Sequence, residues 1–300
     1  MNIYERVDEN YVIFSEQVDA NSFRIKLFCV DTSVNLRECL DKGRAAVFFS
    51  ATLLPIRYYK KLLSAEEDYA IYIASPFPRE HRQIMIGSDV SSRYSRRGQA
   101  EYEKIYHYIE KLIHAKDGNY MVFFPSYRML QDVYAIACAE GLDEQVTLIC
   151  QNPNMKEEAR EEFLRQFEGE HVVAFCILGG IFAEGIDLVG ERLIGTVVVG
   201  IGLPMVCNER EILRNYFEER EGMGFEYAYL YPGMNKVLQA AGRVIRTVED
   251  HGVILLLDER FLRSSSRQLF PREWEGYEVV SLDTVTAISE KFWVEQSDRK

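Results

Sequence analysis

Two arginines, Arg243 and Arg246, stand close together in the stretch QAAGRVIR (Gln239–Arg246). In an α-helix, Gln239, Arg243 and Arg246 would lie on one face, because spacings of four and three residues return to the same side. Two guanidinium groups that converge on one point suit the charge that develops on a transferring phosphoryl group. An amphipathic helix with a basic, solvated outer face has the same pattern, so the stretch alone leaves both interpretations open.

A glycine-rich stretch, GGIFAEGID (Gly179–Asp187), directly follows the apolar run Val172–Leu178. Glycines at the carboxyl end of a parallel strand allow a ligand to approach the backbone, and open α/β sheets bind their ligands at that end. Glu184 and Asp187 add acceptors three residues apart. A tight turn explains the glycines equally well.

The stretch FFPSY (Phe123–Tyr127) has the same position, at the end of one apolar run and the start of a helical pattern. Ser126 is a natural helix cap. The free N–H groups and the hydroxyl at such a helix start could equally hold a nucleic-acid phosphate. Both interpretations stay open at this point.

The overall charge limits how nucleic acid could bind. The formal net charge is −12 and the pI about 5.1, which argues against a protein that coats nucleic acid over its whole surface. A local basic track is still compatible with this charge, and the densest cluster is Arg93, Arg96 and Arg97. A solvated basic surface is the alternative for that cluster.

One strand-like run resembles the metal-binding strand of a nucleotide hydrolase. VILLLDE (Val253–Glu259) ends in two carboxylates, but that role requires a phosphate-cradling GxxxxGK[ST] loop. None of the 19 glycines is followed by lysine. Asp258 and Glu259 are therefore not expected to hold Mg²⁺.

From about Asn119 onward, short apolar runs alternate with helical patterns, which predicts βαβ units on a parallel sheet. The expected strands are Tyr120–Phe124, Val146–Cys150, Val172–Leu178, Thr196–Gly200, Val253–Leu257 and Glu278–Ser281. The expected helices are Tyr127–Glu140, Met155–Glu168 (with Asn154 as its cap), Glu209–Glu219, Asn235–Thr247 and Thr284–Trp293. The fold class is therefore α/β, an open parallel sheet with helices on both faces.

The chain also divides by composition. The first part holds two strand-like runs, Phe23–Val30 and Ala45–Phe49, too few to close a sheet, and the proline-containing SPFPRE (Ser75–Glu80) is a natural linker. We expect one unit over residues 1–75 and a second over 76–300. With 47% apolar and 27% charged residues, no signal peptide and no long apolar run, the composition indicates a cytoplasmic protein without a membrane partner.

Taken together and in this order, the motifs resemble those of XPD/DinG-type ATP-dependent DNA helicases. SATLLP (Ser50–Pro55) resembles the motif that closes the first motor domain of that family. Four stretches resemble the successive motifs of the second: FFPSY, GGIFAEGID with VVGIGLPM (Val198–Met205), QAAGRVIR, and DERF (Asp258–Phe261).

The resemblance implies a RecA-like second motor domain, over residues 76–300, preceded by the end of the first. It implies helicase activity driven by ATP and Mg²⁺ on single-stranded or forked DNA. It assigns Arg243 and Arg246 as catalytic fingers. The residues it implies for the other roles are Gln239, Glu184, Gly185 and Asp187 for the nucleotide, Ser126, Tyr127, Gly179, Gly180, Arg93 and Arg97 for DNA, and Ser50 and Thr52 for domain coupling.

The chain also departs from the family pattern. The phosphate-binding loop and the DEAH box of the first motor domain are missing, as is the cysteine-ligated iron–sulfur insertion, so ATP, Mg²⁺ and any cluster would be bound mainly by that missing domain. We therefore expect a C-terminal piece that is inactive by itself. The alternatives are a non-catalytic single-strand-binding or regulatory module, and an unrelated α/β enzyme such as a nucleotide-sugar transferase.

Overall fold

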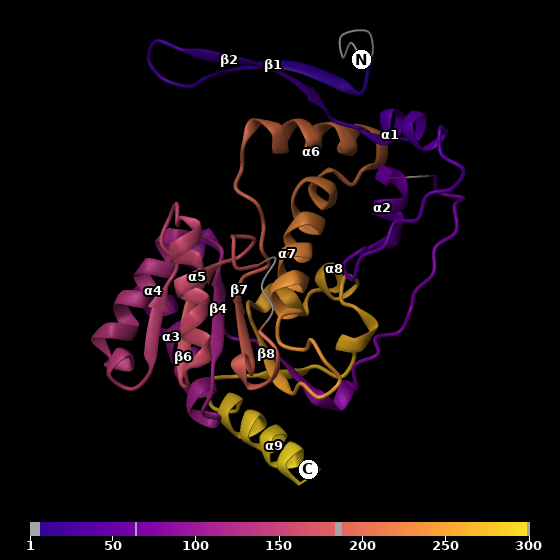
Figure 1. The fold of residues 1–300 in the computed structure, drawn as a ribbon. Coiled ribbons are helices and arrows are strands. Elements are labelled where there is room, and N and C mark those ends of the chain that lie inside the picture. Colours follow the sequence, from indigo (N-terminus) through magenta and orange to yellow (C-terminus); the bar gives the residue numbers. More distant parts are fainter. Residues whose placement is uncertain (1–6, 64, 184–187, 299–300) are drawn as a thin grey trace. The chain divides into compact units, whose positions relative to one another are not determined.

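The main body of the protein is a seven-stranded parallel sheet with the order β5-β6-β4-β7-β8-β3-β9 (Figure 1). The computed structural model describes residues 7–63, 65–183 and 188–298. The strands are β3 (Arg82–Gly87), β4 (Tyr120–Phe124), β5 (Thr147–Cys150), β6 (Val172–Ile177), β7 (Gly195–Val199), β8 (Gly252–Leu257) and β9 (Glu278–Val280).

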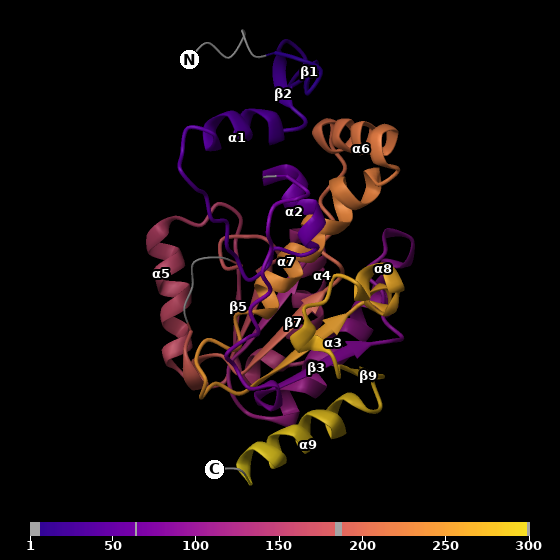
Figure 2. The same ribbon diagram turned by 90° about the vertical axis from the view of Figure 1, so that its right-hand side faces the viewer.

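Helices cover both faces of this sheet, as expected (Figures 1 and 2). Successive side chains of a strand face opposite sides. In β4, Val122 and Phe124 belong to the core that is shared with α3, α4 and α9, whereas Met121 and Phe123 are fully buried on the other side, with α5 and α7. These helices are α3 (Gln99–Ala115), α4 (Tyr127–Ala139), α5 (Glu157–Arg165), α7 (Tyr231–Ala241) and α9 (Val285–Ser297); the short α8 is Ser264–Arg267.

A second compact unit combines the described residues up to Tyr72 with Pro204–Pro232. It contains the antiparallel hairpin of β1 (Tyr11–Gln17) and β2 (Phe23–Cys29), the helices α1 (Ser33–Leu40), α2 (Ile56–Leu63) and α6 (Asn208–Glu221), and a π-helical turn, Glu226–Leu230. Within it, the Tyr58 ring packs edge-on against the Tyr227 ring at a centroid distance of 4.9 Å, and Lys61 pairs with Glu221.

This unit differs from the segment expected from composition. Its first boundary, at Tyr72, is close to the expected one, but residues 204–232 also join it. Whether residues 1–75 are the end of a first motor domain stays a prediction. The run Ala45–Phe49 was expected as a strand but belongs to no strand, and its Val47 side chain is 82% exposed.

Several boundaries were predicted incorrectly. Asn154 does not cap α5, because its φ of 59° is left-handed and the cap position is Lys156. The helix expected over Asn235–Thr247 ends at Ala241. The strand β3 and the helix α3 were not predicted at all.

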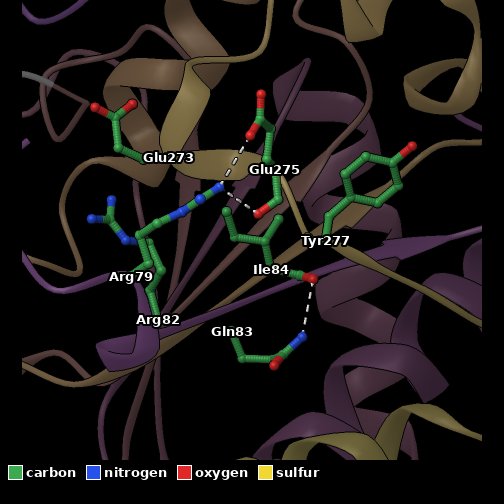
Figure 3. Close-up of a pocket in the computed structure, with 8 residues that line it drawn as sticks. Arg79, Arg82, Gln83, Ile84, Glu273, Glu275 and Tyr277 are labelled. Carbon is green, nitrogen blue, oxygen red and sulfur yellow. Dashed lines mark hydrogen bonds and ion pairs between the residues drawn. The ribbon is translucent and has the colours of Figure 1, made fainter. Parts of the chain in front are cut away.

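The expected linker is attached to the sheet unit at the amino ends of β3 and β9 (Figure 3). The Ser75 N–H donates to Glu273 Oε1 at 3.1 Å, and the Arg79 guanidinium donates to the carbonyls of Arg272 and Glu275 at 2.9 and 3.0 Å. A polar, solvent-open pocket of about 80 Å³ lies there, lined by Arg79, Arg82, Gln83, Ile84, Glu273, Glu275, Gly276 and Tyr277 (Figure 3). This attachment fixes where β3 enters the sheet.

Two glycines, Gly202 and Gly233, lie where the chain leaves the sheet unit and where it returns, and they let the two backbones come into contact. A Cβ on Gly202 would lie 2.5 Å from the Gly233 carbonyl oxygen, and one on Gly233 would lie 2.7 Å from the Ile201 carbonyl oxygen. No side chain fits at either position, so the two backbones touch. The segment 204–232 therefore begins and ends at one place.

Candidate functional site at the carboxyl edge of the sheet

The carboxyl ends of the parallel strands meet along one edge of the sheet, where α/β proteins bind their ligands. The loops that leave this edge carry Ser126 and Tyr127 after β4, Gly179 and Gly180 after β6, and Arg93 and Arg97 after β3, whereas Arg243 and Arg246 lie between α7 and the amino end of β8. These residues fall into two groups. One surrounds the loop after β6, residues 178–183, which we call the β6 loop; the other surrounds the ends of β8 and β3.

Tyr127 is held at this edge by a residue that sequence reasoning missed. Gln151 directly follows β5 and is 3% exposed. Its Nε2 donates to the Tyr127 hydroxyl at 3.1 Å, and its Oε1 accepts the Ile177 N–H at 2.9 Å. Gln151 thereby joins the start of α4 to the end of β6.

Ser126 takes the structural role that its position allows. Its Oγ accepts the Met129 N–H at 3.3 Å and so caps α4. The Ser126 side chain is half-buried, and its cap leaves the first N–H groups of α4 at the carboxyl edge. Ser126 and Tyr127 therefore both lie at the start of α4, at the carboxyl edge of the sheet.

The β6 loop contacts α7 through a lysine that was also missed. Gly179 has a φ of +73°, and a Cβ there would lie 2.7 Å from Lys236 Cδ. The Lys236 side chain packs against the Cα of Gly179, and the left-handed backbone there favours glycine. Gly180 lies on the opposite side of the loop, where its Cβ would be 3.3 Å from Gln151 Nε2.

Arg243 is not a projecting side chain. It is 9% exposed, and its guanidinium donates to the Ala183 carbonyl through Nε, at 3.1 Å, and through a terminal nitrogen. Because α7 ends at Ala241, Arg243 and Arg246 do not share a helical face with Gln239, contrary to the expectation. The three residues still follow one another at the end of α7, with Gln239 and Arg246 half-buried.

Asp250 fixes the backbone around Arg246. Its Oδ2 accepts the N–H groups of Arg246 at 2.7 Å and Thr247 at 2.8 Å. Burial raises the pKa of Asp250, but these donors and the Thr247 hydroxyl lower it by more, so the pKa lies below its usual value. The carboxylate is therefore charged at neutral pH and stabilises this non-helical turn.

The second group surrounds Asp258, at the end of β8. Asp258 is fully buried, and its oxygens accept from Ser92 N and Oγ and from Arg260 N, Nε and a terminal nitrogen, all at 2.8–2.9 Å. Every acceptor position faces a protein donor, so this carboxylate is not available to a metal ion. The two partners instead tie the ends of β3 and β8 together.

The basic cluster lies beside this network and is largely paired. Arg93 and Arg96 each approach Glu259 at 3.5 Å, and Arg96 also pairs with Glu101 at 2.9 Å. The Arg97 Nε donates to the Ser92 carbonyl at 3.2 Å. β8 and β4 are two places apart in the sheet, roughly 10 Å, so this cluster and Tyr127 form separate groups along one edge.

The remaining expected residues lie elsewhere. Glu184, Gly185 and Asp187 fall outside the described residues. Ser50 and Thr52 belong to the other compact unit, where their hydroxyls are 3.2 Å apart and the Thr52 N–H donates to Ser50 Oγ.

Sequence reasoning missed Gln151, Lys236, Ser92 and Arg260. Gln151 carried a usable signal, since it directly follows an expected strand. Lys236 carried none, because its contact is with a loop distant in sequence.

No group of three or more His, Cys, Asp or Glu residues in the described part of the chain could hold a metal ion. In the same part, no helix is long and apolar enough to cross a membrane. The polar side chains around the β6 loop are the Tyr127 hydroxyl, the Gln151 amide, the Lys236 ammonium and the Arg243 guanidinium. Such groups recognise phosphate oxygens.

Comparison with known proteins assigns the chain to a family. The family described as the helicase C-terminal domain matches residues 109–277, more than half of the chain. Among curated proteins, a probable ATP-dependent helicase of Methanocaldococcus jannaschii is 27% identical over 95% of this chain and 44% of its own length. The XPD helicase subunit of general transcription and DNA repair factor IIH from Schizosaccharomyces pombe is 26% identical over 89% of this chain and 37% of its own.

Solved structures agree on the fold. An XPD helicase structure matches with a TM-score of 0.68 and 21% identity, covering 91% of this chain and 48% of that chain. The Xpd4 protein of S. tokodaii matches with a TM-score of 0.57 and 17% identity, covering 86% of this chain and 49% of that chain. The chain spans less than half the length of each of these relatives. It belongs to the helicase C-terminal domain family, and its sheet has the RecA-like α/β fold of the XPD-type helicases.

Proposed function

We propose that this chain is the C-terminal motor half of an ATP-dependent DNA helicase. In the complete motor, ATP hydrolysis in a cleft between two motor domains drives movement along single-stranded DNA and the unwinding of forked duplexes. The relatives named above include a DNA repair factor subunit, and DNA repair is the process we propose for this chain. By itself the chain is expected to be inactive.

The observation that carries this proposal is the position of the β6 loop. On one side the loop contacts Gln151, which holds Tyr127, and on the other side it contacts Lys236 and Arg243 of the α7 region. A motor must link its nucleotide side to its DNA side, because a change at the first must move the second. The β6 loop contacts Gln151 beside Tyr127 and also contacts Lys236 and Arg243, so it is suited to link a DNA side to a nucleotide side.

The residues near the end of α7 fit one side of a nucleotide. Gln239 offers an amide, and Arg246 a guanidinium, for phosphate oxygens. The described residues offer no cluster of carboxylates for Mg²⁺, and Asp258 is fully occupied by Ser92 and Arg260. The metal and the phosphate cradle would therefore come from another motor domain, whose bound ATP–Mg²⁺ supplies the phosphoryl group that is transferred to water.

Within this half-site the described residues have separate tasks. Arg246 would stabilise the charge that develops on the phosphoryl oxygens. Arg243 would keep the β6 loop in place through the Ala183 carbonyl. Tyr127 and the backbone N–H groups at the start of α4 would contact the DNA strand, together with the backbone at Gly179 and Gly180.

Exposed apolar segments support a missing partner domain. In the unit that contains residues up to Tyr72, Val47, Phe49, Tyr69 and Ile71 are each more than 80% exposed. Exposed apolar side chains in segments outside any helix or strand are suited to packing against another domain. We propose that this other domain is the first motor domain, and that Ser50 and Thr52 couple it to the second.

The proposal is tested with the chain as it stands. We expect no ATPase activity with or without single-stranded DNA, and weak, salt-sensitive binding of a labelled oligothymidylate in a fluorescence anisotropy titration. Tyr127→Ala should weaken this binding at least tenfold, since base stacking and a phosphate contact are both removed. The matched control Arg246→Ala should bind as the parent does.

Two outcomes would contradict the proposal. ATP turnover that survives repurification and disappears in Arg246→Ala would show that the chain is a complete hydrolase. Equal losses of DNA binding in Tyr127→Ala and Arg246→Ala would mean that DNA and nucleotide do not occupy separate surfaces.

A further inference from the structure

We propose that Gln151 is a positioning residue for DNA binding: it sets the hydrogen-bond polarity of the Tyr127 hydroxyl, so that this hydroxyl donates to a backbone phosphate of a single strand. The inference rests on the proposed function, because it assumes that Tyr127 contacts DNA. It concerns a residue that itself cannot reach the strand, since Gln151 is 3% exposed.

The orientation of the Gln151 amide follows from its partners. The Ile177 N–H is a donor only, so the Gln151 atom 2.9 Å from it must be the oxygen. The amide nitrogen then lies 3.1 Å from the Tyr127 oxygen and donates to it. The opposite orientation would place two donors against each other at Ile177.

The consequence falls on the Tyr127 hydroxyl. A phenolic hydroxyl has one hydrogen, which it can donate, and an oxygen that can accept. Because the oxygen accepts from Gln151, the hydrogen points away from the amide and is available to another acceptor. A phosphate oxygen of a DNA strand accepts and never donates, so it matches a hydroxyl held in this state.

The surroundings of Gln151 keep this arrangement fixed. Its backbone N–H donates to the Phe175 carbonyl at 2.8 Å, which anchors the residue to the end of β6. A Cβ on Gly180 would approach Gln151 Nε2 to 3.3 Å, so the amide fills the space beside the β6 loop. The side chain therefore has little freedom to rotate away from Tyr127.

A double-mutant cycle tests the proposal on the full chain. The probe is a labelled oligothymidylate, and the variants are Gln151→Met, Tyr127→Phe and the pair. Each single variant should weaken binding roughly tenfold, as expected for a lost hydrogen bond to a charged group. The double variant should be no weaker than Tyr127→Phe alone, because Gln151 acts only through the hydroxyl.

A second variant reverses the polarity directly. Gln151→Glu keeps an acceptor for the Ile177 N–H but presents a carboxylate oxygen to Tyr127, so the hydroxyl must donate inward. Its binding should be at least as weak as that of Gln151→Met. It also keeps the test decisive if Gln151→Met does not fold, which far-ultraviolet circular dichroism and thermal unfolding would reveal.

Tyr106→Phe is the matched control, since it removes a hydroxyl that donates to Glu110 at 3.1 Å on α3. It should bind DNA as the parent does. A full additional loss from Gln151→Met in the Tyr127→Phe background would overturn the proposal while leaving the proposed function intact. Absence of DNA binding by the parent chain at low salt would instead overturn the proposed function, and this inference with it.

Discussion

The two groups along the carboxyl edge use their polar side chains in opposite ways. Around Asp258, charges are satisfied by one another: the carboxylate is fully buried and Arg260 and Ser92 occupy its oxygens. Around the β6 loop, side chains instead bind neutral groups: the Gln151 amide contacts the Tyr127 hydroxyl and the Ile177 N–H, and the Arg243 guanidinium donates to the Ala183 carbonyl. Substitutions in the first group should therefore affect mainly stability, and those in the second mainly function.

The largest effect should come from Arg246 in a motor that includes a first motor domain with its own phosphate-binding loop. Arg246→Ala should reduce ATP turnover by about 10³-fold and change ATP binding less, as expected for a charge that acts on the transition state. Steady-state turnover and nucleotide titration measure the two effects separately. Near-normal turnover would show that Arg246 has no catalytic role. Substitutions near the β6 loop would then not affect function more than those around Asp258 do.

Asp258 should show the largest effect on stability. Asp258→Ala leaves Arg260 without its buried partner and should lower the free energy of unfolding by about 3 kcal/mol, measured by urea denaturation. Glu259→Ala is the control: Glu259 is 32% exposed, and its pairs with Arg93 and Arg96 are expected to contribute less than ~1 kcal/mol. Equal effects in the two variants would show that burial does not separate these carboxylates.

The contribution of Asp258 also has a defined pH range. Burial raises the pKa of Asp258, but Arg260 and the Ser92 N–H lower it by more, so the pKa lies below its usual value. A lowered carboxyl pKa stabilises the fold fully above about pH 4, the unfolded value, and the contribution is lost as the pH falls further. The difference in stability between the parent and Asp258→Asn should therefore shrink below that pH.

The smallest effect should be that of the basic cluster on DNA affinity. Arg93→Ala and Arg97→Ala should each weaken oligonucleotide binding by less than about threefold, because Arg93 is paired with Glu259 and Arg97 with a backbone carbonyl. Anisotropy titrations at two salt concentrations measure this effect. A tenfold loss in either variant would extend the DNA path across the whole edge and end the distinction between the two groups.

The sequence predicted six of the seven strands of the sheet, and β4, β6, β7 and β8 among them are apolar runs because both of their faces are buried. It missed β3, whose partners β8 and β9 lie at the other end of the chain. It also missed α3, in which tyrosines such as Tyr106 and Tyr108 occupy fully buried positions. Local patterns cannot indicate partners so distant.

Several residues of the site were predicted from the sequence, but the positions of their side chains relative to one another were not. The end of α7 at Ala241 was not predicted, and beyond it Asp250 accepts the N–H groups of Arg246 and Thr247, which keeps them out of helical bonding. Arg243, also beyond the helix end, donates to the Ala183 carbonyl. Local hydrogen bonds between the Asp250 side chain and the nearby backbone compete with helix formation here.

The contact between Gly202 and Gly233 has a consequence for how such chains change over time. A segment whose two ends meet can gain or lose residues without moving the strand before it or the helix after it, and loop-closure entropy rises only slowly with added length. Among related chains, insertions and deletions should therefore accumulate within residues 204–232, while the register of β7 and the part of α7 from Gly233 onward stay constant.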